Sequence, residues 1–305
     1  MTTATDSTHP TSDIFRHGSM VQLSVSAWTG RVKLPPKRIM DAALDTDPAF
    51  VGAFKRLVDA DALAKIASIG AEARRYVYSR SLPFPVEGAV FVPTPLIPEV
   101  DARLAESKAR YESAVSNFVS DFEAFREQAR LKLGQLFDAR DYPKDVARRF
   151  GMDWRFVVMA PAGQTQLIDP MLVAREQERF ADLMQRAQRE AVGALRVRFA
   201  ELVDHAVDRL AGGRDGGKPK VFRDTLVENW RDFVSVFSAL NISDDVQLTK
   251  LVETCEAALS GVDAKDLRDD TKLREHVACK LSGVQQNLDA MLADRPTRKI
   301  TIKAV

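Results

Sequence analysis

The stretch Glu99–Phe137, "EVDARLAESKARYESAVSNFVSDFEAFREQARLKLGQLF", carries the strongest structural signal in the chain. Its apolar residues recur every three or four positions, which is the spacing of an amphipathic helix close to a heptad repeat. They are Val100, Leu104, Tyr111, Val115, Phe118, Phe122, Phe125, Ala129, Leu133 and Leu136. We expect one helix over 99–137, about 60 Å long if it is straight. A bend near Gly134 is the alternative.

A second long helix is predicted over Pro170–Leu210, and it ends before Gly212 and Gly213. Its apolar positions have the same spacing: Phe180, Leu183, Ala187, Ala191, Leu195, Leu202, Ala206 and Leu210. Two apolar stripes of similar length, separated by a short insert, are best buried against each other. We therefore expect residues 99–212 to form a long antiparallel helical hairpin.

The insert between these helices has the pattern of a small β-hairpin. Trp154–Met159 reads as a strand, Pro161 to Gly163 as a turn and Gln164–Ile168 as the returning strand. The link 138–153 could span a straight helix of about 60 Å only if it were nearly fully extended. The β-hairpin, at about 140–169, is therefore expected at the far tip of the helical hairpin.

Residues 21–98 read as a small α+β base. Val21–Trp28 alternates apolar and polar residues, and Gly88–Val92 is continuously apolar, so both are expected as strands of one small sheet. The tail around Ile300 and Ile302 could add an edge strand. Helices are expected over 48–58 and 61–80. The polar residues 1–20 are expected to be disordered.

The rest of the chain is predicted to be helical, with a linker at 213–221 and a C-terminal region over 222–305. Its expected helices are 222–240, 244–259 and 271–293. The predicted fold class is mostly α (α+β). It comprises the helical hairpin, a small β-sheet at its base, the β-hairpin at its tip and a C-terminal helical bundle.

The amino-acid composition limits the classes of function that this protein could have. The chain has 305 residues with 44 basic and 43 acidic side chains, so no global field attracts nucleic acid or an anionic membrane. Two cysteines suggest a reducing compartment. The polar N-terminus lacks the apolar core of a signal peptide, and no apolar run reaches the length of a membrane span. These features predict a cytoplasmic protein.

The motifs that could carry chemistry are weak. Gly212, Gly217 and Lys218 have the spacing of a phosphate-binding loop, but Pro219 stands where that loop needs Ser or Thr. His276, Cys279 and Cys255 could be imagined around zinc, although buried small cysteines are the commoner case. No pattern predicts a catalytic centre. We expect no cofactor, no metal and no enzymatic activity.

Aromatic residues are the better candidates for partner contact. Tyr142, Trp154 and Phe156 fall at the predicted tip, where a small β-hairpin cannot bury them alone. Trp28 and Arg31, with Lys33 nearby, are the corresponding candidates for partner contact at the base. The alternative is that these aromatics are core residues and that the cations extend along them.

Four stretches together resemble a known family. They are "SAWTGRVKLP", "LPFP…FVPTPLIPEV", "LGQLFDARDYP" (Leu133–Pro143) and "FVVMAP". The chain, from about Val21 to the end of the second long helix, resembles a family of uncharacterised bacterial and phage proteins. Its members are often encoded near MoxR-type AAA+ ATPases and von Willebrand factor A proteins. The resemblance implies an adaptor or scaffold role and supplies no catalytic residue.

Two functional hypotheses follow. The first is a non-enzymatic interaction, scaffold or adaptor protein that binds a protein partner, such as an AAA+ ATPase, or forms a homo-oligomer. The second is a nucleic-acid-binding accessory factor that uses basic residues of the linker and tail. Those residues are Arg214, Lys218, Lys220, Arg223, Arg298 and Lys299.

Overall fold

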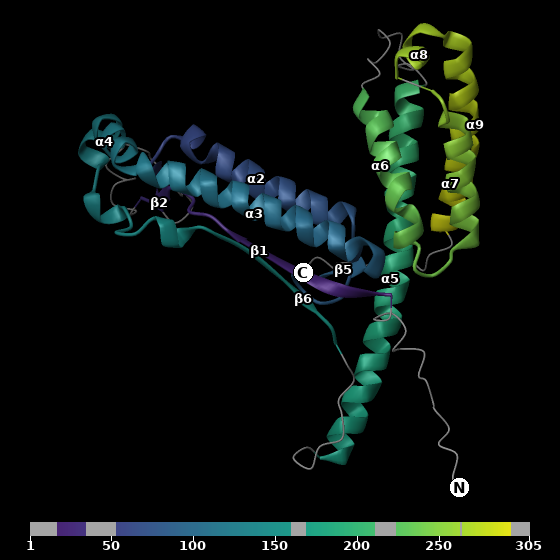
Figure 1. Ribbon diagram of the computed structural model, residues 1–305, viewed down its shortest axis with the longest axis horizontal. Coiled ribbons are helices and arrows are strands. Elements are labelled where there is room, and N and C mark those ends of the chain that lie inside the picture. Colours follow the sequence, from purple (N-terminus) through teal and green to yellow (C-terminus); the bar gives the residue numbers. More distant parts are fainter. Residues whose placement is uncertain (1–16, 35–52, 160–168, 211–223, 263, 294–305) are drawn as a thin grey trace, which may run out of the picture. The chain divides into compact units, whose positions relative to one another are not determined.

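A computed structural model describes residues 17–34, 53–159, 169–210, 224–262 and 264–293. Over these residues the protein is mostly helical, with eight α-helices and six β-strands (Figure 1). The predicted class, mostly α with a minor β component, is confirmed. The finer architecture differs from the expectation in several places.

The strands form two sheets. The larger has the order β4-β5-β1-β6, and the smaller pairs β2 with β3. The strand bounds are β1 Gly18–Ser26, β2 Arg31–Lys33, β3 Phe54–Arg56, β4 Leu82–Pro83, β5 Val90–Pro93 and β6 Gly151–Val157. The predicted meeting of the first strand with residues 88–92 is confirmed, because β1 and β5 are neighbours.

The helices were largely predicted by the periodicity of the sequence. Their bounds are α2 Ala60–Ser79, α3 Ile97–Ser120, α4 Phe122–Leu133, α5 Pro170–Leu210, α6 Asp224–Leu240, α7 Val246–Leu259, α8 Ala264–Asp269 and α9 Thr271–Ala293. Short 3-10 turns follow α4, at Gly134–Leu136 (η4), Ala139–Asp141 (η5) and Ala147–Arg149 (η6). The bounds of α5 and α9 match the predicted ones.

The chain divides into two compact units. Unit 1 takes residues 1–20, 79–97 and 157–305, and unit 2 takes residues 21–78 and 98–156. The division falls inside β1 and β6, so both strands contribute residues to each unit.

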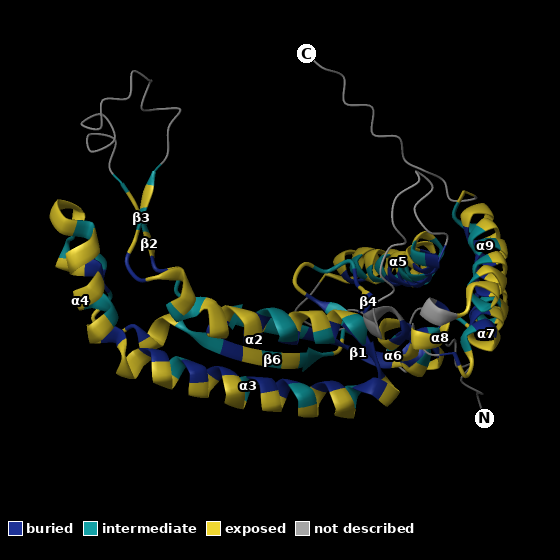
Figure 2. Ribbon diagram, turned by 90° about the horizontal axis from the view of Figure 1, so that it is seen from above, coloured by how far each residue is buried: buried dark blue, intermediate teal, exposed yellow. Residues whose placement is uncertain are grey.

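Unit 2 is built from two helices laid along two strands. Figures 1 and 2 both show α2 and α3 running side by side along β1 and β6. Tyr111 of α3 is 1% exposed and donates its hydroxyl proton to the Ser26 carbonyl, at 2.6 Å. A Cβ added to Gly70 of α2 would lie 3.0 Å from the Val25 side chain, so the helix and the strand are in close contact.

Unit 1 is a helical bundle in which α5 packs against α9 and α6. Phe199 of α5 is fully buried, and its ring stacks on Phe233 of α6 at 5.6 Å between centroids. Trp230 lies against the same ring at 5.7 Å. The apolar stripe of the long helix is therefore covered by C-terminal helices.

A partly buried ion pair joins α5 to the start of α7. Asp245 accepts from the Leu248 amide as the N-cap of α7 and receives the Arg196 guanidinium at 2.7 Å. Burial by itself would raise the pKa of Asp245, but the hydrogen bonds from Arg196 and the backbone outweigh it and lower that pKa. The carboxylate is thus held in its charged form.

The predicted hairpin of two long helices is wrong. From Pro98 onward, α3 and α4 belong to unit 2, whereas the described part of α5 belongs to unit 1 and takes α9 and α6 as partners. The periodicity identified both apolar stripes, but any apolar surface of suitable shape can cover such a stripe. Each helix finds its cover within its own unit.

The predicted single helix over 99–137 is divided in two. It breaks for one residue at Asp121, where the Ser120 hydroxyl bonds back to the Asn117 carbonyl at 2.8 Å. Such bonds from serine to the preceding turn commonly bend helices. The second part ends at Leu133, and Gly134 takes a positive φ of 51°. The helix thus ends next to Gly134, the residue at which the alternative placed a bend.

The predicted β-hairpin at a far tip is also wrong. Strand β6 pairs in the main sheet beside β1, and Trp154 donates to Asp101 near the start of α3. After α4 the chain turns back, so β6 returns along α3 instead of standing at its far end. The expected returning strand, 164–168, lies outside the described residues.

Two further expectations concern the base. The helix predicted over 48–58 is wrong for Phe54–Arg56, which form β3. The disorder expected over residues 1–20 is wrong for Gly18–Met20, which are the first residues of β1. The segments 1–16, 35–52, 211–223 and 294–305 lie outside the described residues, so the rest of the N-terminus, the linker and the tail strand remain predictions.

Candidate interaction surface

The small sheet of unit 2 is a two-stranded antiparallel ribbon. Strands β2 and β3 pair with Arg31 opposite Arg56, Val32 opposite Lys55, and Lys33 opposite Phe54. The ribbon begins just after Gly30, whose φ of 61° suits glycine and whose added Cβ would press on Val58 at 3.0 Å. It lies at the α4 end of unit 2 (Figure 2).

One face of the ribbon gathers three cations and one aromatic ring. Side chains alternate across a strand, so Arg31, Lys33, Phe54 and Arg56 share a face, and Val32 and Lys55 share the other. All four residues of the first face are exposed. We call these four residues the basic face.

The backbone bonds show how close these side chains are. The Leu34 amide donates to the Ala53 carbonyl, and the Leu57 amide donates to the Gly30 carbonyl. Hydrogen-bonded and non-hydrogen-bonded pairs alternate along an antiparallel ladder, so the Arg31–Arg56 and Lys33–Phe54 pairs are of the non-hydrogen-bonded kind. Side chains lie closest in such pairs.

The opposite face of the ribbon is anchored to the segment after α4. The Lys55 side chain is 8% exposed, and its Nζ lies 2.6 Å from Asp141 Oδ2 and 2.5 Å from the Leu136 carbonyl oxygen. Tyr142 donates its hydroxyl proton to the Leu57 carbonyl at 2.8 Å. The stretch Leu133–Pro143 therefore braces the ribbon from behind.

An aromatic cluster supports this brace. It comprises Trp28, Phe118, Phe122, Phe125, Phe137, Tyr142 and Phe150, joined by ring contacts of 5.6–6.2 Å between centroids. Phe122 is 8% exposed and touches both Trp28 and Tyr142. Burial raises the pKa of the Tyr142 hydroxyl, which keeps it protonated as a donor.

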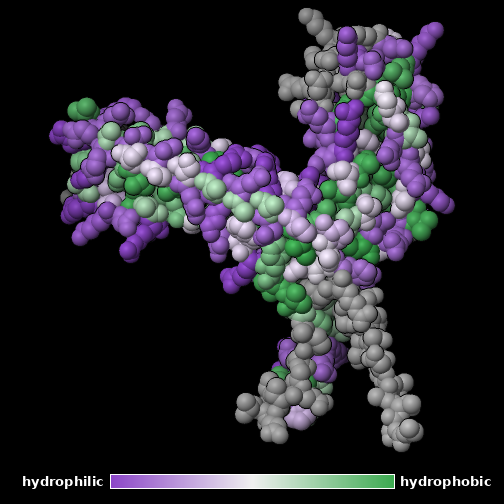
Figure 3. Space-filling view, in the orientation of Figure 1, coloured by the Kyte–Doolittle hydropathy of each residue, from purple (hydrophilic) through white to green (hydrophobic). Residues whose placement is uncertain are grey.

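The basic face differs from the other charged surfaces of unit 2. On α2 and α3, whose outer surface is mostly hydrophilic in Figure 3, Glu72 receives the guanidinium groups of Arg103 and Arg110 at 2.8 and 2.9 Å. The hydrogen bond from Arg110 lowers the pKa of Glu72. The basic face carries no carboxylate of its own, and Arg31 instead lies over the Phe54 ring at 4.9 Å.

The aromatic residues predicted to contact a partner have separate places. Tyr142 is buried in the aromatic cluster, and Trp28 is half-buried against Phe118 and Phe122. Trp154 and Phe156 lie half-buried on β6, where the Trp154 ring has Lys108 over it at 5.8 Å. Of the five predicted residues, Arg31 is the one on the basic face.

The basic residues predicted for nucleic acid are not placed. Arg214, Lys218, Lys220, Arg223, Arg298 and Lys299 all lie outside the described residues. Phe54 and Arg56 were missed because 48–58 was read as a helix. The run "FKRLV" does not alternate apolar and polar residues, so the local pattern gave no signal for a strand there.

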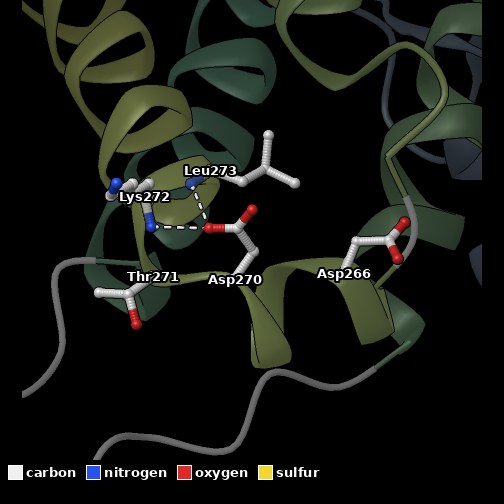
Figure 4. A pocket seen from close by; sticks show the side chains of 5 residues that line it. All are labelled: Asp266, Asp270, Thr271, Lys272 and Leu273. Atoms are coloured by element: carbon white, nitrogen blue, oxygen red, sulfur yellow. Dashed lines mark hydrogen bonds between the residues drawn. The ribbon is translucent and has the colours of Figure 1, made fainter.

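Other candidate centres have structural explanations. Figure 4 shows a depression lined by Asp266, Asp270, Thr271, Lys272 and Leu273. There the Asp270 carboxylate accepts from the Lys272 and Leu273 amides at 2.8 and 3.0 Å, which makes it the cap of the α9 N-terminus.

The cysteines do not form a metal site with their neighbours. Cys255 is buried, and burial raises the pKa of its thiol to about 12, while Cys279 is exposed. Over the residues that the structure describes, no group of three His, Cys, Asp or Glu side chains could hold a metal ion. Within the same ranges, no helix is both long and apolar enough to cross a membrane.

These features define a two-unit α+β protein whose most distinctive surface is a braced basic ribbon. The family model DUF3150, described as a protein of unknown function, matches residues 17–282. The chain belongs to this family. No curated protein and no solved structure matches it.

Proposed function

We propose that this protein is a non-enzymatic interaction protein that binds an anionic macromolecular partner through the basic face of unit 2. The observation that carries the proposal is the gathering of Arg31, Lys33 and Arg56 on one exposed face of a ribbon. Binding of an anionic partner gains the most free energy where the fold already holds several cations close together.

Folding gains little from this arrangement. Arg31 and Arg56 are directly opposite each other, and like charges in such a pair destabilise a sheet by a few tenths of a kcal/mol. Phe54 is 55% exposed, so its ring contributes little to the core. An anion that binds between the cations would attract both of them and so offset their mutual repulsion.

The identity of the partner is a separate question. A MoxR-type AAA+ ATPase, which the family resemblance implies, remains a prediction, as does a homo-oligomer. A scaffold with a remote tip would need two long helices packed against each other, whereas α5 takes α9 and α6 as its partners. The adaptor role proposed here depends on the ribbon alone.

We expect the purified full chain to be retained on immobilised heparin, a polyanion, at low salt and to elute as the salt concentration rises. The variant Arg31→Gln/Lys33→Gln/Arg56→Gln should elute at clearly lower salt, because each lost phosphate-like or sulfate-like contact removes one released counterion. Its thermal unfolding should be unchanged, since these side chains are exposed.

A matched variant controls for net charge. Lys65→Gln/Lys144→Gln/Arg155→Gln also removes three exposed cations of unit 2, at positions outside β2 and β3. It should elute at nearly the wild-type salt concentration. Equal shifts for the two triple variants would show that general charge, and not the basic face, retains the protein, and the proposal would then fail.

A further inference from the structure

We infer that the anionic partner is a single-stranded nucleic acid, with phosphates held by the cations of the basic face and a base stacked on Phe54. This inference rests on the proposed function and adds the chemical class of the partner. Proteins that bind single strands combine cations that follow the backbone with exposed aromatic rings that stack on bases. The basic face has both.

Phe54 is the residue that distinguishes a nucleic acid from other anionic partners. Its side chain is 55% exposed although it lies on a sheet face directly opposite Lys33 and beside Arg31. The Arg31 guanidinium lies 4.9 Å from the ring centroid. The guanidinium covers one face of the ring, and because it is planar a base can stack on it as well as on the free part of the ring.

An acidic peptide would use the surface less completely. Carboxylates would pair with Arg31, Lys33 and Arg56 but would make no use of the exposed part of the Phe54 ring. A nucleotide offers a phosphate and a planar base on the same unit, so it can engage a cation and the ring together.

Duplex DNA also fits the geometry less well. A two-stranded ribbon can enter its major groove, but the bases there are already stacked on one another and can offer only their edges. The Phe54 ring could not stack on them without disrupting the duplex. The geometry therefore points to unpaired bases.

The number of cations determines how strongly the affinity should depend on the salt concentration. With three phosphate contacts on a single strand, the logarithm of the affinity should fall with the logarithm of the salt concentration with a slope of about −2. Non-specific dissociation constants are of the order of 10⁻⁴ to 10⁻⁶ M at physiological salt. Measurements should therefore be made at low salt.

The test uses the full chain and a fluorescently labelled oligothymidylate of about twenty nucleotides, with fluorescence anisotropy as the readout. Phe54→Leu should weaken binding at least about fivefold, because stacking on one aromatic ring commonly contributes that much. Phe54→Trp should bind as tightly as wild type or more tightly. The Phe54→Leu variant should still elute from heparin at the wild-type salt concentration, since it keeps every cation.

Other results would overturn the inference and identify which part fails. Retention on heparin without binding of oligothymidylate would leave the proposed function standing and remove nucleic acid as the partner. Tighter binding of polyglutamate than of oligothymidylate would assign an acidic protein segment instead. Equal affinity for a duplex of the same length, or no effect of Phe54→Leu, would remove base stacking. If the wild-type protein were not retained on heparin, the proposed function itself would fail.

Discussion

Phe122→Asp is expected to unfold unit 2, with a loss of about 4 kcal/mol or more in the free energy of unfolding. Phe122 is 8% exposed and lies between the Trp28 and Tyr142 rings at 5.7 and 6.2 Å. A carboxylate there would be surrounded by aromatic rings. Chemical denaturation followed by circular dichroism and by tryptophan fluorescence would measure the loss.

Leu131→Asp is the matched control for this substitution. Leu131 lies on the same helix, α4, but its side chain is 74% exposed. The same kind of substitution should change the free energy of unfolding by no more than about 1 kcal/mol, including the effect of an acid near a helix C-terminus. Similar losses for both variants would contradict the assignment of the aromatic cluster as the core of this end of unit 2.

Phe199→Ala is expected to destabilise unit 1 by about 3–5 kcal/mol. The Phe199 ring is fully buried and stacks on the Phe233 ring. The Trp230 ring also contacts it. Its removal would leave a cavity between α5 and α6 that the helices can only partly close. Thermal unfolding followed by circular dichroism should show a lower midpoint for the helical signal.

Met171→Ala is the control for the second substitution. Met171 stands at the start of the same helix and is 81% exposed, so its truncation should change stability by less than about 0.5 kcal/mol. If Phe199→Ala were as well tolerated as Met171→Ala, the packing of α5 against the C-terminal helices would be contradicted. The hairpin with the other long helix would then need to be considered again.

Helices were predictable because local periodicity defines them. The bounds of α5 and α9 were predicted to the residue, and α2 to within one residue at each end. The partners of the helices were not predictable in this way. Phe199 and Val203, both fully buried, were left out of the predicted apolar stripe because the pattern was drawn for one partner, whereas α5 packs against more than one element.

The ribbon was harder to predict because it depends on a long-range pairing. Phe54–Arg56 is a three-residue strand that meets Arg31–Lys33 across a connection of twenty residues. A run this short has no helical or strand period of its own. Arg31 could be suspected of contact with a partner, but the neighbouring Arg56 and Phe54 become visible only once the strands are paired.

The stretch that carries the family resemblance also has a physical role. The residues of "LGQLFDARDYP" include the Leu136 carbonyl and the Asp141 carboxylate that hold Lys55, and Tyr142, which bonds to Leu57. This segment fixes one face of the ribbon and leaves the other face open. The architecture of unit 2 therefore gives this motif a structural role.

The most direct test of the basic face as a binding surface is a nuclear magnetic resonance titration of the isotope-labelled full chain with a short heparin oligosaccharide. We expect the largest chemical-shift changes on Arg31, Lys33, Phe54 and Arg56, with little change along α6 to α9. Changes confined to unit 1, or spread evenly over exposed lysines and arginines of both units, would contradict it.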